Sequence, residues 1–293
     1  MQVGRYQVLE TIGVGAYSKV VRGHDPLIDR SVAIKLFSPH LVRGDGRQHF
    51  LREARVVGKL SHPSVITVHD MGIEESTQTP YLVMELVEGQ ALEKIIGKGS
   101  IPFPLACQWA GHVAEALGAA HRRAVIHGDI KPANILIMND NRLKLTDFGM
   151  ARLASHQTDA AVRGTPAYWC PEQILGRAQD ERSDLFSLGV VLHEMLTGIS
   201  PFAGESIPTV CNQILSSTPQ PPSRSNPSIP SVLDEIVASC LVKEPQQRVA
   251  SAEGLAERLF PLARRTPTPS QQVAVGSPEP TLRSRAGRLL RSA

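Results

Sequence analysis

The sequence predicts an α+β fold of two lobes, a small, mainly antiparallel β N-lobe with one key helix and a larger, mainly α C-lobe. Three observations support this. Residues 5 to 37 alternate apolar and polar positions in three runs, as strands with one buried face do. Residues 105 to 120 repeat apolar positions at steps of three and four, which indicates a helix. Residues 185 to 196 are apolar on nearly every face, so this helix should be buried.

The first lobe is expected to open with an antiparallel meander over residues 6 to 12, 19 to 23 and 31 to 37. Its first turn reads Gly13-Val14-Gly15-Ala16-Tyr17-Ser18. Because a strand follows the turn and not a helix, the glycines indicate a backbone flap that can approach phosphates, not a dinucleotide-binding fold. Ser18 stands where a third glycine would be, and an ordinary glycine hairpin is the alternative.

The third run contains Val32-Ala33-Ile34-Lys35, so a lysine projects from a strand of β-branched residues. Apolar residues at helical spacing predict a helix over residues 47 to 60. Glu53 lies on this helix, and it is a candidate partner that would aim Lys35 at phosphates. Taken singly, Lys35 could equally be a solvated edge lysine and Glu53 a surface glutamate.

Two further strands are expected at residues 65 to 72 and 81 to 85, and residues 86 to 89 would connect the two lobes. The helix of residues 105 to 120 carries Trp109, which is expected in the core. This helix ends before the loop His127-Gly128-Asp129-Ile130-Lys131-Pro132-Ala133-Asn134.

Two short apolar runs, residues 135 to 138 and 143 to 146, flank a polar turn and predict a hairpin that leads to Asp147. A hairpin brings its two ends together, so we expect Asp129, Asn134 and Asp147 to converge on one point. Oxygen-bearing side chains around one point suit a hard cation such as Mg²⁺ with a nucleophile beside it.

After the hairpin, residues 150 to 163 are polar without a clear period, and residues 164 to 172 close this stretch. Ser183 or Asp184 is expected to cap the buried helix. The Pro-rich residues 219 to 230 predict a loop. Further helices are predicted near residues 205 to 215, 231 to 241 and 251 to 260.

The charge is unevenly distributed along the chain. The net charge of the 293 residues is +3, but residues 264 to 293 hold six arginines and one acid, Glu279, so residues 1 to 263 are slightly acidic. We therefore expect a domain over residues 1 to 263 and no nucleic-acid binding by it. The Pro, Ser and Arg-rich residues 264 to 293 predict a disordered tail, which either stays solvated or touches an acidic membrane or a partner.

The cysteines Cys107, Cys170, Cys211 and Cys240 show no pairing or metal-ligand spacing, which is typical of reduced thiols in a cytoplasmic protein. No signal peptide is expected at the amino terminus, because it has no basic stretch followed by an apolar one. No apolar run is long enough to predict a membrane span.

In order, the glycine turn, Val-Ala-Ile-Lys, the helix glutamate, His-Gly-Asp-Ile-Lys-Pro-Ala-Asn, Asp-Phe-Gly and Cys-Pro-Glu resemble the eukaryotic-type (Hanks-type) Ser/Thr protein kinases, particularly bacterial members. The resemblance covers about residues 5 to 260. It implies a bilobal protein-kinase fold, with an N-lobe of about residues 1 to 85, a hinge at 86 to 89 and a C-lobe of about 90 to 263. The implied reaction is phosphorylation of Ser/Thr hydroxyls on protein substrates with ATP and Mg²⁺, or alternatively Mn²⁺.

The resemblance also implies roles for individual residues. Asp129 would accept or steer the proton of the attacking hydroxyl, and Lys131 would neutralise the moving phosphoryl group. Glu53 would orient Lys35, and Thr165 would brace Asp129 and Lys131. The implied metal ligands are Asn134 and Asp147. The implied structural ion pair is Glu172 with Arg248. The implied nucleotide-binding residues are Ile12, Gly13, Val14, Gly15, Ala16, Tyr17, Ser18, Val20, Ala33, Lys35, Met84, Glu85 and Val87.

Two positions depart from the family pattern. Gly128 stands where an arginine usually precedes the catalytic aspartate, so phosphorylation of Thr158 or Thr165 would not switch catalysis through the usual charge pair. Cys170 replaces the usual alanine, which we interpret as a packing change.

Two other functions fit part of the pattern. His-Gly-Asp also resembles the loop of aminoglycoside and choline kinases, but Lys131 and residues 164 to 172 favour a protein substrate. A pseudokinase scaffold is the remaining alternative, although the residues for Mg-ATP chemistry are present.

Overall fold

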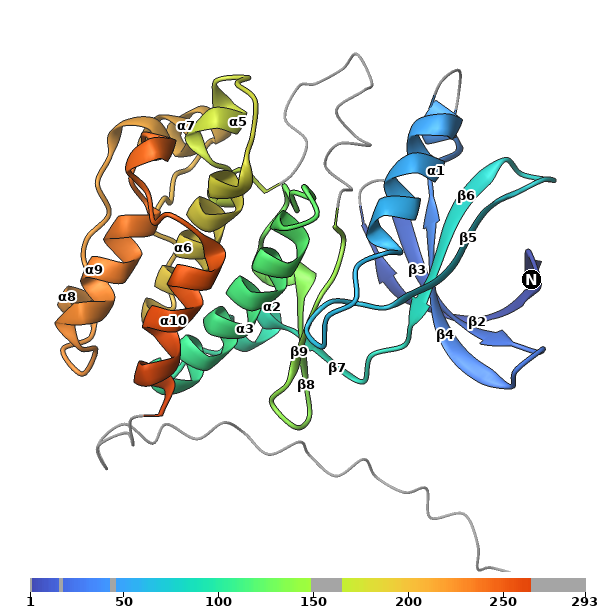
Figure 1. Ribbon diagram of the computed structural model, residues 1–293, viewed down its shortest axis with the longest axis horizontal. Helices are drawn as coiled ribbons and strands as arrows, with labels where there is room; N and C mark the ends of the chain where they lie inside the picture. The colour runs from blue at the N-terminus through green and yellow to red at the C-terminus, as the bar shows by residue number, and fades with distance from the viewer. Residues whose placement is uncertain (1, 16–17, 43–45, 149–164, 265–293) are drawn as a thin grey trace, which may run out of the picture.

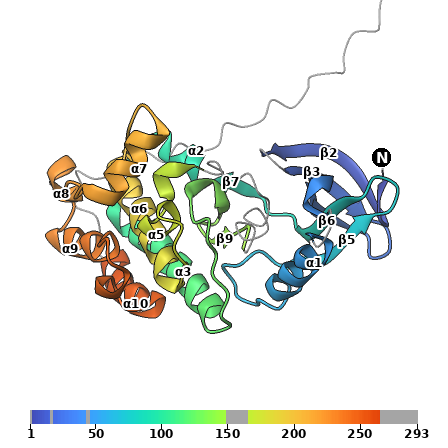
Figure 2. The ribbon, with the colours of Figure 1, turned by 90° about the horizontal axis from the view of Figure 1, so that it is seen from above.

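The computed structural model describes residues 2 to 15, 18 to 42, 46 to 148 and 165 to 264, with residues 41 and 42 described by their backbone only. Within these ranges the chain forms two lobes, a curled sheet with one helix and a bundle of helices (Figures 1 and 2). The predicted α+β, bilobal fold is confirmed.

The N-terminal sheet has six described strands in the order β1-β2-β3-β4-β6-β5, and every neighbouring pair is antiparallel. β5 begins at Val68, later than the predicted residue 65, because Val65 instead makes an isolated bridge to Leu145. The strands are β1 (Gln2–Val3), β2 (Tyr6–Val14), β3 (Ser18–Asp25), β4 (Arg30–Phe37), β5 (Val68–Glu74) and β6 (Thr79–Glu85).

Helix α1 (Gly46–Val57) is the helix of the N-terminal lobe, preceded by the short η1 (Pro39–Val42). Its apolar residues Phe50, Ala54 and Val57 share one face and are buried. The ring of Phe50 meets Phe37 of β4 edge to face at 5.5 Å between centroids. This contact attaches α1 to the strand that carries Lys35.

The hairpin that was expected after Asn134 is present as β8 (Ile135–Met138) and β9 (Leu143–Leu145). A third strand, β7 (Gly89–Ala91), pairs with β8 directly after the link between the lobes. The short helix α2 (Leu92–Ile96) directly follows β7 in sequence, and the short η2 (Pro132–Asn134) directly precedes β8. The hairpin therefore begins at Asn134 and ends close to Asp147.

The C-terminal lobe is built on α3 (Phe103–His121), which packs against α10 (Ala252–Ala263) and α6 (Glu181–Thr197). Trp109 is buried as expected, and its indole N–H donates to the backbone oxygen of Asn141 at 3.0 Å. A side chain at Gly111 would place its Cβ 2.8 Å from the ring of Phe260, so glycine allows α3 and α10 to approach closely.

Helix α6 (Glu181–Thr197) lies inside the lobe and is buried on nearly all faces, as predicted. Its cap differs from the prediction: the N-cap is Asp180, whose side chain accepts from the Arg182 amide, while Ser183 completes a capping box. Ser183 and Asp184 belong to the first turn. Asp184 is thereby free for another contact, described below.

The remaining described elements surround this core. A short helix, α8, interrupts the Pro-rich segment that was predicted as a loop. The elements are η3 (Pro166–Tyr168), α5 (Pro171–Ile174), α7 (Ile207–Ser216), α8 (Pro222–Ser225), α9 (Ser231–Cys240) and η4 (Pro245–Gln247).

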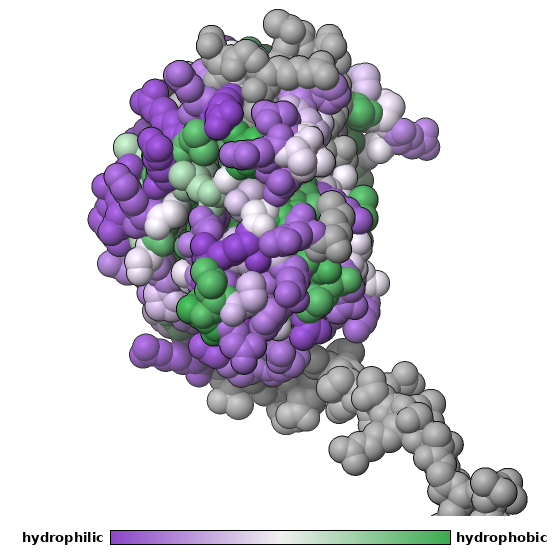
Figure 3. Space-filling model, turned by 90° about the vertical axis from the view of Figure 1, so that its right-hand side faces the viewer, coloured by the Kyte–Doolittle hydropathy of each residue, from purple (hydrophilic) through white to green (hydrophobic). Residues whose placement is uncertain are grey.

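The surface of the sheet lobe is mostly hydrophilic, and its apolar patches are separated by polar side chains (Figure 3). Exposed apolar side chains in this lobe include Leu9, Leu27 and Ile28. Of the helices that the structure describes, none has the length and apolar character needed to cross a membrane.

Candidate active site

Lys35 and Asp147 meet between the two lobes. Lys35 projects from β4 and is 7% exposed, and its Nζ lies 2.6 Å from Asp147 Oδ1. Burial alone would raise the pKa of the Asp147 carboxyl, but the Lys35 ammonium outweighs it, so this pKa lies below its ordinary value. The carboxylate is therefore charged at neutral pH, beside a buried cation.

The expected ion pair between Lys35 and Glu53 is not present among the described ion pairs. Glu53 is partly exposed on α1, while the Lys35 ammonium is bound to Asp147. The sequence indicated that a carboxylate would hold Lys35, but it could not show which of two acids would lie nearer.

Asp147 is held in a left-handed conformation, with φ of 68°. Such a φ is uncommon for a residue with a side chain, and it costs about 1 kcal/mol or more. Phe148 next to it is buried, and its ring lies 4.5 Å from the imidazole of His127. This packing anchors the backbone that carries Asp147 to the predicted catalytic loop, residues 127 to 134.

The carboxylate of Asp129 is bound by two side chains of its own loop. Lys131 Nζ lies 2.7 Å from Asp129 Oδ2, and Asn134 Nδ2 donates to the same oxygen at 3.0 Å. Asn134 Nδ2 also donates to the backbone oxygen of Asp129 at 2.8 Å. The loop therefore places the carboxylate of Asp129, a possible proton acceptor, beside the ammonium group of Lys131, as expected from the sequence.

Asn134 and Asp147 offer oxygen atoms for a cation. Both described hydrogen bonds of the Asn134 amide use its nitrogen, which leaves Oδ1 without a bond among the described residues. The amide of Thr146 donates to the Asn134 backbone oxygen at 2.9 Å, so Asn134 lies beside the segment that leads into Asp147. One amide oxygen and one carboxylate fit a hard divalent cation.

These two residues would not enclose such a cation alone. The described residues contain no cluster of three or more His, Cys, Asp or Glu side chains that could hold a metal ion. Further oxygen ligands would have to come from water or from a bound phosphate group.

Asp184 of α6 holds the predicted catalytic loop by two backbone amides, a contact that was not predicted. Its Oδ1 accepts from the Gly128 amide at 2.8 Å, and its Oδ2 accepts from the His127 amide at 2.9 Å. His121 Nε2 lies 2.8 Å from the same Oδ2. A buried acid at the start of an apolar helix was the available signal, and it was interpreted as a helix cap.

Several residues expected to contact a nucleotide base gather in one apolar cluster. Ala33 and Met84 are buried, and Val20 and Val87 are partly buried against them. The prediction missed two members of this cluster, Ile66 and Leu86, because an apolar run does not show which side chain faces a cavity.

The backbone expected at the base edge follows β6. The Glu85 amide is already bonded to the Thr67 oxygen at 2.9 Å. The Val87 amide, by contrast, makes no backbone hydrogen bond to a described residue in the loops and turns. The Glu85 side chain does not enter the cluster, because Lys144 binds it at 2.7 Å.

The glycine turn is partly described. Ile12 and Val14 are exposed, Gly13 lies at a register shift between β2 and β3, and the Gly15 amide donates to the Ser18 oxygen at 2.7 Å. The predicted site residues Ala16 and Tyr17 lie outside the described residues, as does Thr158.

The segment after residue 164 supplies one predicted pair. Arg248 binds Glu172 through two parallel contacts, of 2.7 Å to Oε1 and 2.6 Å to Oε2, and both side chains are buried. Thr165, however, is exposed, and no described hydrogen bond connects it to Asp129 or Lys131. The expected brace is therefore not formed in this structure.

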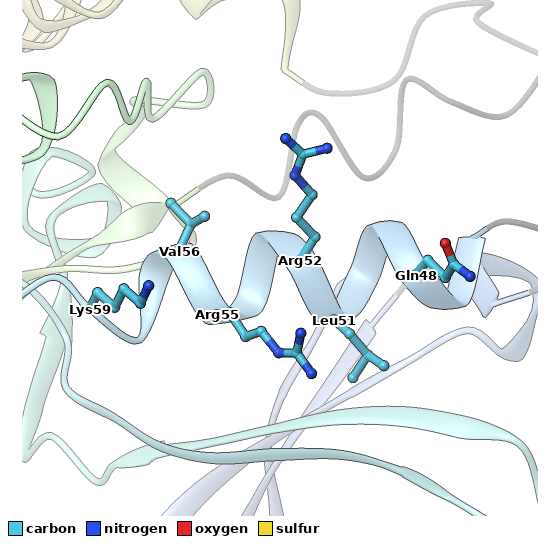
Figure 4. Close-up of a pocket in the computed structure, with 6 residues that line it drawn as sticks. All are labelled: Gln48, Leu51, Arg52, Arg55, Val56 and Lys59. Atoms are coloured by element: carbon cyan, nitrogen blue, oxygen red, sulfur yellow. The ribbon is translucent and has the colours of Figure 1, made fainter.

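A separate hollow lies along α1 (Figure 4). Its lining residues recur three or four positions apart, so they share one face of the helix. They are Gln48, Leu51, Arg52, Arg55, Val56 and Lys59. This hollow contains no residue of the predicted nucleotide or metal sites.

Comparisons with known proteins identify the family to which this chain belongs. Residues 6 to 260 match the family model described as the protein kinase domain. A serine/threonine-protein kinase named PknB from Mycobacterium leprae is 39% identical over 256 residues, which cover 85% of this chain and 41% of that protein.

Two further relatives show the same relation. Serine/threonine-protein kinase PksC from Streptomyces coelicolor is 35% identical over 273 residues, covering 89% of this chain and 49% of the relative. A probable serine/threonine-protein kinase from Clostridium perfringens is 37% identical over 254 residues, covering 85% and 37%. This chain thus spans less than half the length of each of these relatives.

Proposed function

This chain belongs to the protein kinase family, and from that membership and the site geometry we propose that it transfers the γ-phosphoryl group of ATP to Ser and Thr hydroxyls of proteins. The observation that carries the proposal is the arrangement of Asp129, which is bound by Lys131 at 2.7 Å and by Asn134 at 3.0 Å. This arrangement supports a role for Asp129 in accepting the proton of an attacking hydroxyl and a role for Lys131 in balancing charge on the moving phosphoryl group.

Most of the catalysis is proposed to come from positioning and from charge. Asp129 would orient the acceptor hydroxyl and take its proton, while Lys131 would balance negative charge on the phosphoryl group in flight. Both side chains are less than one-third exposed, which supports strong electrostatic interactions at this point.

The cofactor is proposed to be Mg·ATP, with Mn²⁺ as the alternative metal. Asn134 Oδ1 and the Asp147 carboxylate would hold the cation, which when bound neutralises phosphate charge. Mg²⁺ is favoured because both groups are hard oxygen donors, and because this ion is commonly completed by water and phosphate oxygens.

The nucleotide is proposed to lie between the two lobes. The adenine would contact Val20, Ala33, Met84 and Val87, which form the apolar cluster near the link between the lobes. The backbone of residues 12 to 18 would cover the phosphates, including Ala16 and Tyr17.

Lys35 is proposed to bind the α and β phosphates, and Glu53 to orient it once the nucleotide is present. In the structure, the same lysine binds Asp147 at 2.6 Å. The proposal therefore requires Lys35 to exchange a carboxylate partner for phosphate oxygens, which carry the same sign of charge.

The acceptor is proposed to be a protein segment lying along residues 165 to 172. Residues 165 to 172 are anchored at their carboxyl end by the buried pair of Glu172 and Arg248. Reaction with ATP in the cytoplasm is proposed, in keeping with four cysteines that are all free thiols.

A phosphate-transfer assay tests the proposal. Wild-type protein and Asp147→Asn would be incubated with radiolabelled ATP, Mg²⁺ and a mixture of Ser and Thr peptides. We expect label on peptide hydroxyls with the wild type and a loss of roughly 100-fold or more with the variant. ATP binding by the wild type without any transfer would contradict the proposal and favour a scaffold, whereas label on a small molecule alone would favour the small-molecule kinases.

A further inference from the structure

The peptide group between Gly128 and Asp129 is held at both of its polar atoms. The Gly128 oxygen accepts a hydrogen bond from Gln173 Nε2 at 3.0 Å. The Asp129 N–H donates to His127 Nδ1 at 3.2 Å. This peptide plane ends at the α-carbon of Asp129, so a rotation of the plane would displace the Asp129 carboxylate.

The imidazole of His127 is itself oriented by a second bond. Its Nε2 lies 2.8 Å from the Thr146 oxygen, and since Nδ1 accepts from Asp129, Nε2 must carry the proton and donate. The N–H side of the peptide group is thus tied to the strand end that precedes Asp147. Its C=O side depends on Gln173.

The amide of Gln173 has one possible orientation. Its Oε1 accepts from the Cys170 N–H at 3.0 Å, while its Nε2 donates to the Gly128 oxygen. A flipped amide would place oxygen against oxygen at Gly128 and nitrogen against N–H at Cys170. The two contacts therefore fix each other, and they join the first turn of α5 to the catalytic loop.

The residues next to Gln173 are themselves held by side-chain contacts. Gln173 forms the capping box of α5 with Cys170. The preceding residue, Glu172, is buried and bound through both oxygens by Arg248. A side chain that starts from such an anchor can transmit the position of residues 165 to 172 to the catalytic loop.

Gly128 makes this connection direct. Its φ of 76° lies in the left-handed region that favours glycine, and it has no side chain to act at this position. Its N–H donates to the buried Asp184 carboxylate at 2.8 Å, and its C=O accepts from the neutral amide of Gln173. Both polar groups of Gly128 therefore have partners in the C-terminal lobe. No phosphate group is needed to complete these bonds.

We propose that Gln173 is a positioning residue for the reaction: by holding the Gly128 carbonyl it fixes the orientation of Asp129, and it couples the protein-docking segment of residues 165 to 172 to the catalytic loop. The inference rests on the proposed kinase function and extends it. In this proposal the neutral Gln173 amide connects residues 165 to 172 to the catalytic loop. In a kinase with arginine at position 128, a charged pair would make that connection.

Two substitutions separate the two ends of the amide. Gln173→Glu keeps the oxygen that caps α5 but replaces the donor to Gly128 with a carboxylate oxygen, and Gln173→Ala removes both contacts. Gln246→Glu is the matched control, because it makes the same charge change at an exposed residue of the same lobe. Steady-state kinetics with a Ser peptide and Mg·ATP, together with thermal unfolding, would be measured for each protein.

We expect kcat to fall roughly 10- to 100-fold in both Gln173 variants, because a donor to the carbonyl is lost. The KM values for ATP and peptide should stay within about threefold of wild type, since the residue touches neither substrate. The unfolding temperature of Gln173→Glu should fall by no more than about 5 °C, because Gln173 is only partly buried. Gln246→Glu should match wild type in every respect.

Two results would overturn the proposal. One is a kcat of Gln173→Glu within twofold of wild type while Gln173→Ala is impaired, because the residue would then act only as a helix cap. The other is a loss of kcat that disappears after correction for the folded fraction. If the wild type itself transfers no phosphate, the kinase function fails, and this outcome is distinct from both.

Discussion

Replacing Asp184 by asparagine should weaken both the fold and the reaction, because this carboxylate holds the catalytic loop on α6. The side chain is 1% exposed and accepts from the amides of His127 and Gly128 at 2.9 and 2.8 Å, with His121 Nε2 also at 2.8 Å. In Asp184→Asn, one oxygen becomes an NH₂ group. In either orientation of the amide, that group faces a backbone N–H that has lost its acceptor.

The size of the effect follows from these contacts. A hydrogen bond to a charged group contributes about 1.5 to 3 kcal/mol, and a buried donor left without an acceptor costs about 1 to 3 kcal/mol. The free energy of unfolding should therefore fall by about 2 to 4 kcal/mol. For a domain of this size, that corresponds to a loss of about 5 to 15 °C in unfolding temperature.

Asp180→Asn on the same helix is the matched control. Asp180 caps α6, and asparagine caps helices about as well as aspartate, so this variant should change stability by less than about 0.5 kcal/mol. Thermal unfolding and kcat would be measured for both variants. If Asp184→Asn unfolds at the wild-type temperature with unchanged kcat, the reasoning about this carboxylate is wrong.

Two further predictions concern buried charges. Glu172→Gln should lower the free energy of unfolding by about 3 kcal/mol in urea titrations, since it leaves the buried Arg248 without its counter-charge. Burial opposes ionisation of Glu172, but Arg248 outweighs it and holds the pKa of Glu172 below its ordinary value. The stabilisation of the fold by ionised Glu172 is therefore complete above the pKa of the unfolded state and is lost as pH falls through the lower pKa of the folded state. Glu172→Gln should remove this part of the dependence of unfolding free energy on acid pH. An equally steep dependence in the variant would contradict the prediction. Burial lowers the pKa of Lys243 to about 8, and its Nζ lies 4.4 Å from the ring centre of Phe202 with no described hydrogen-bond partner. Between about pH 8 and 10.5 the unfolded chain holds a proton on Lys243 that the folded chain has released, so stability should rise with pH in this range. Lys243→Met should flatten that rise in a pH series of unfolding temperatures. A wild-type curve without the rise would contradict the lowered pKa of Lys243.

Much of the fold could be predicted because its patterns have unambiguous periods. The run around Lys35 predicted a strand, now seen as β4, although Val32 to Lys35 are all buried and the alternation had predicted only one buried face. The apolar faces of residues 185 to 196 predicted a buried helix, now seen as α6. The convergence of Asp129 and Asn134 was also foreseeable, because both lie on one short loop closed by η2 and the hairpin after it.

The partners of individual charges were harder to predict. Lys35 can reach more than one carboxylate, and the choice of Asp147 over Glu53 depends on how α1 lies relative to the sheet. Asp184 was misassigned because a cap and an anchor for a distant loop use the same residue type at nearly the same position. The contact between Gln173 and the Gly128 oxygen joins segments 45 residues apart and has no signature in sequence spacing.

The most direct test of the account is mass spectrometry of the protein and of a host lysate after incubation with ATP and Mg²⁺, with Asp129→Asn in parallel. We expect phosphate on Ser and Thr side chains with the wild type, including Thr158 if the protein modifies itself, and none above background with the variant. Phosphate on tyrosine alone would contradict the proposed Ser/Thr specificity, and equal labelling by Asp129→Asn would contradict the proposed role of Asp129.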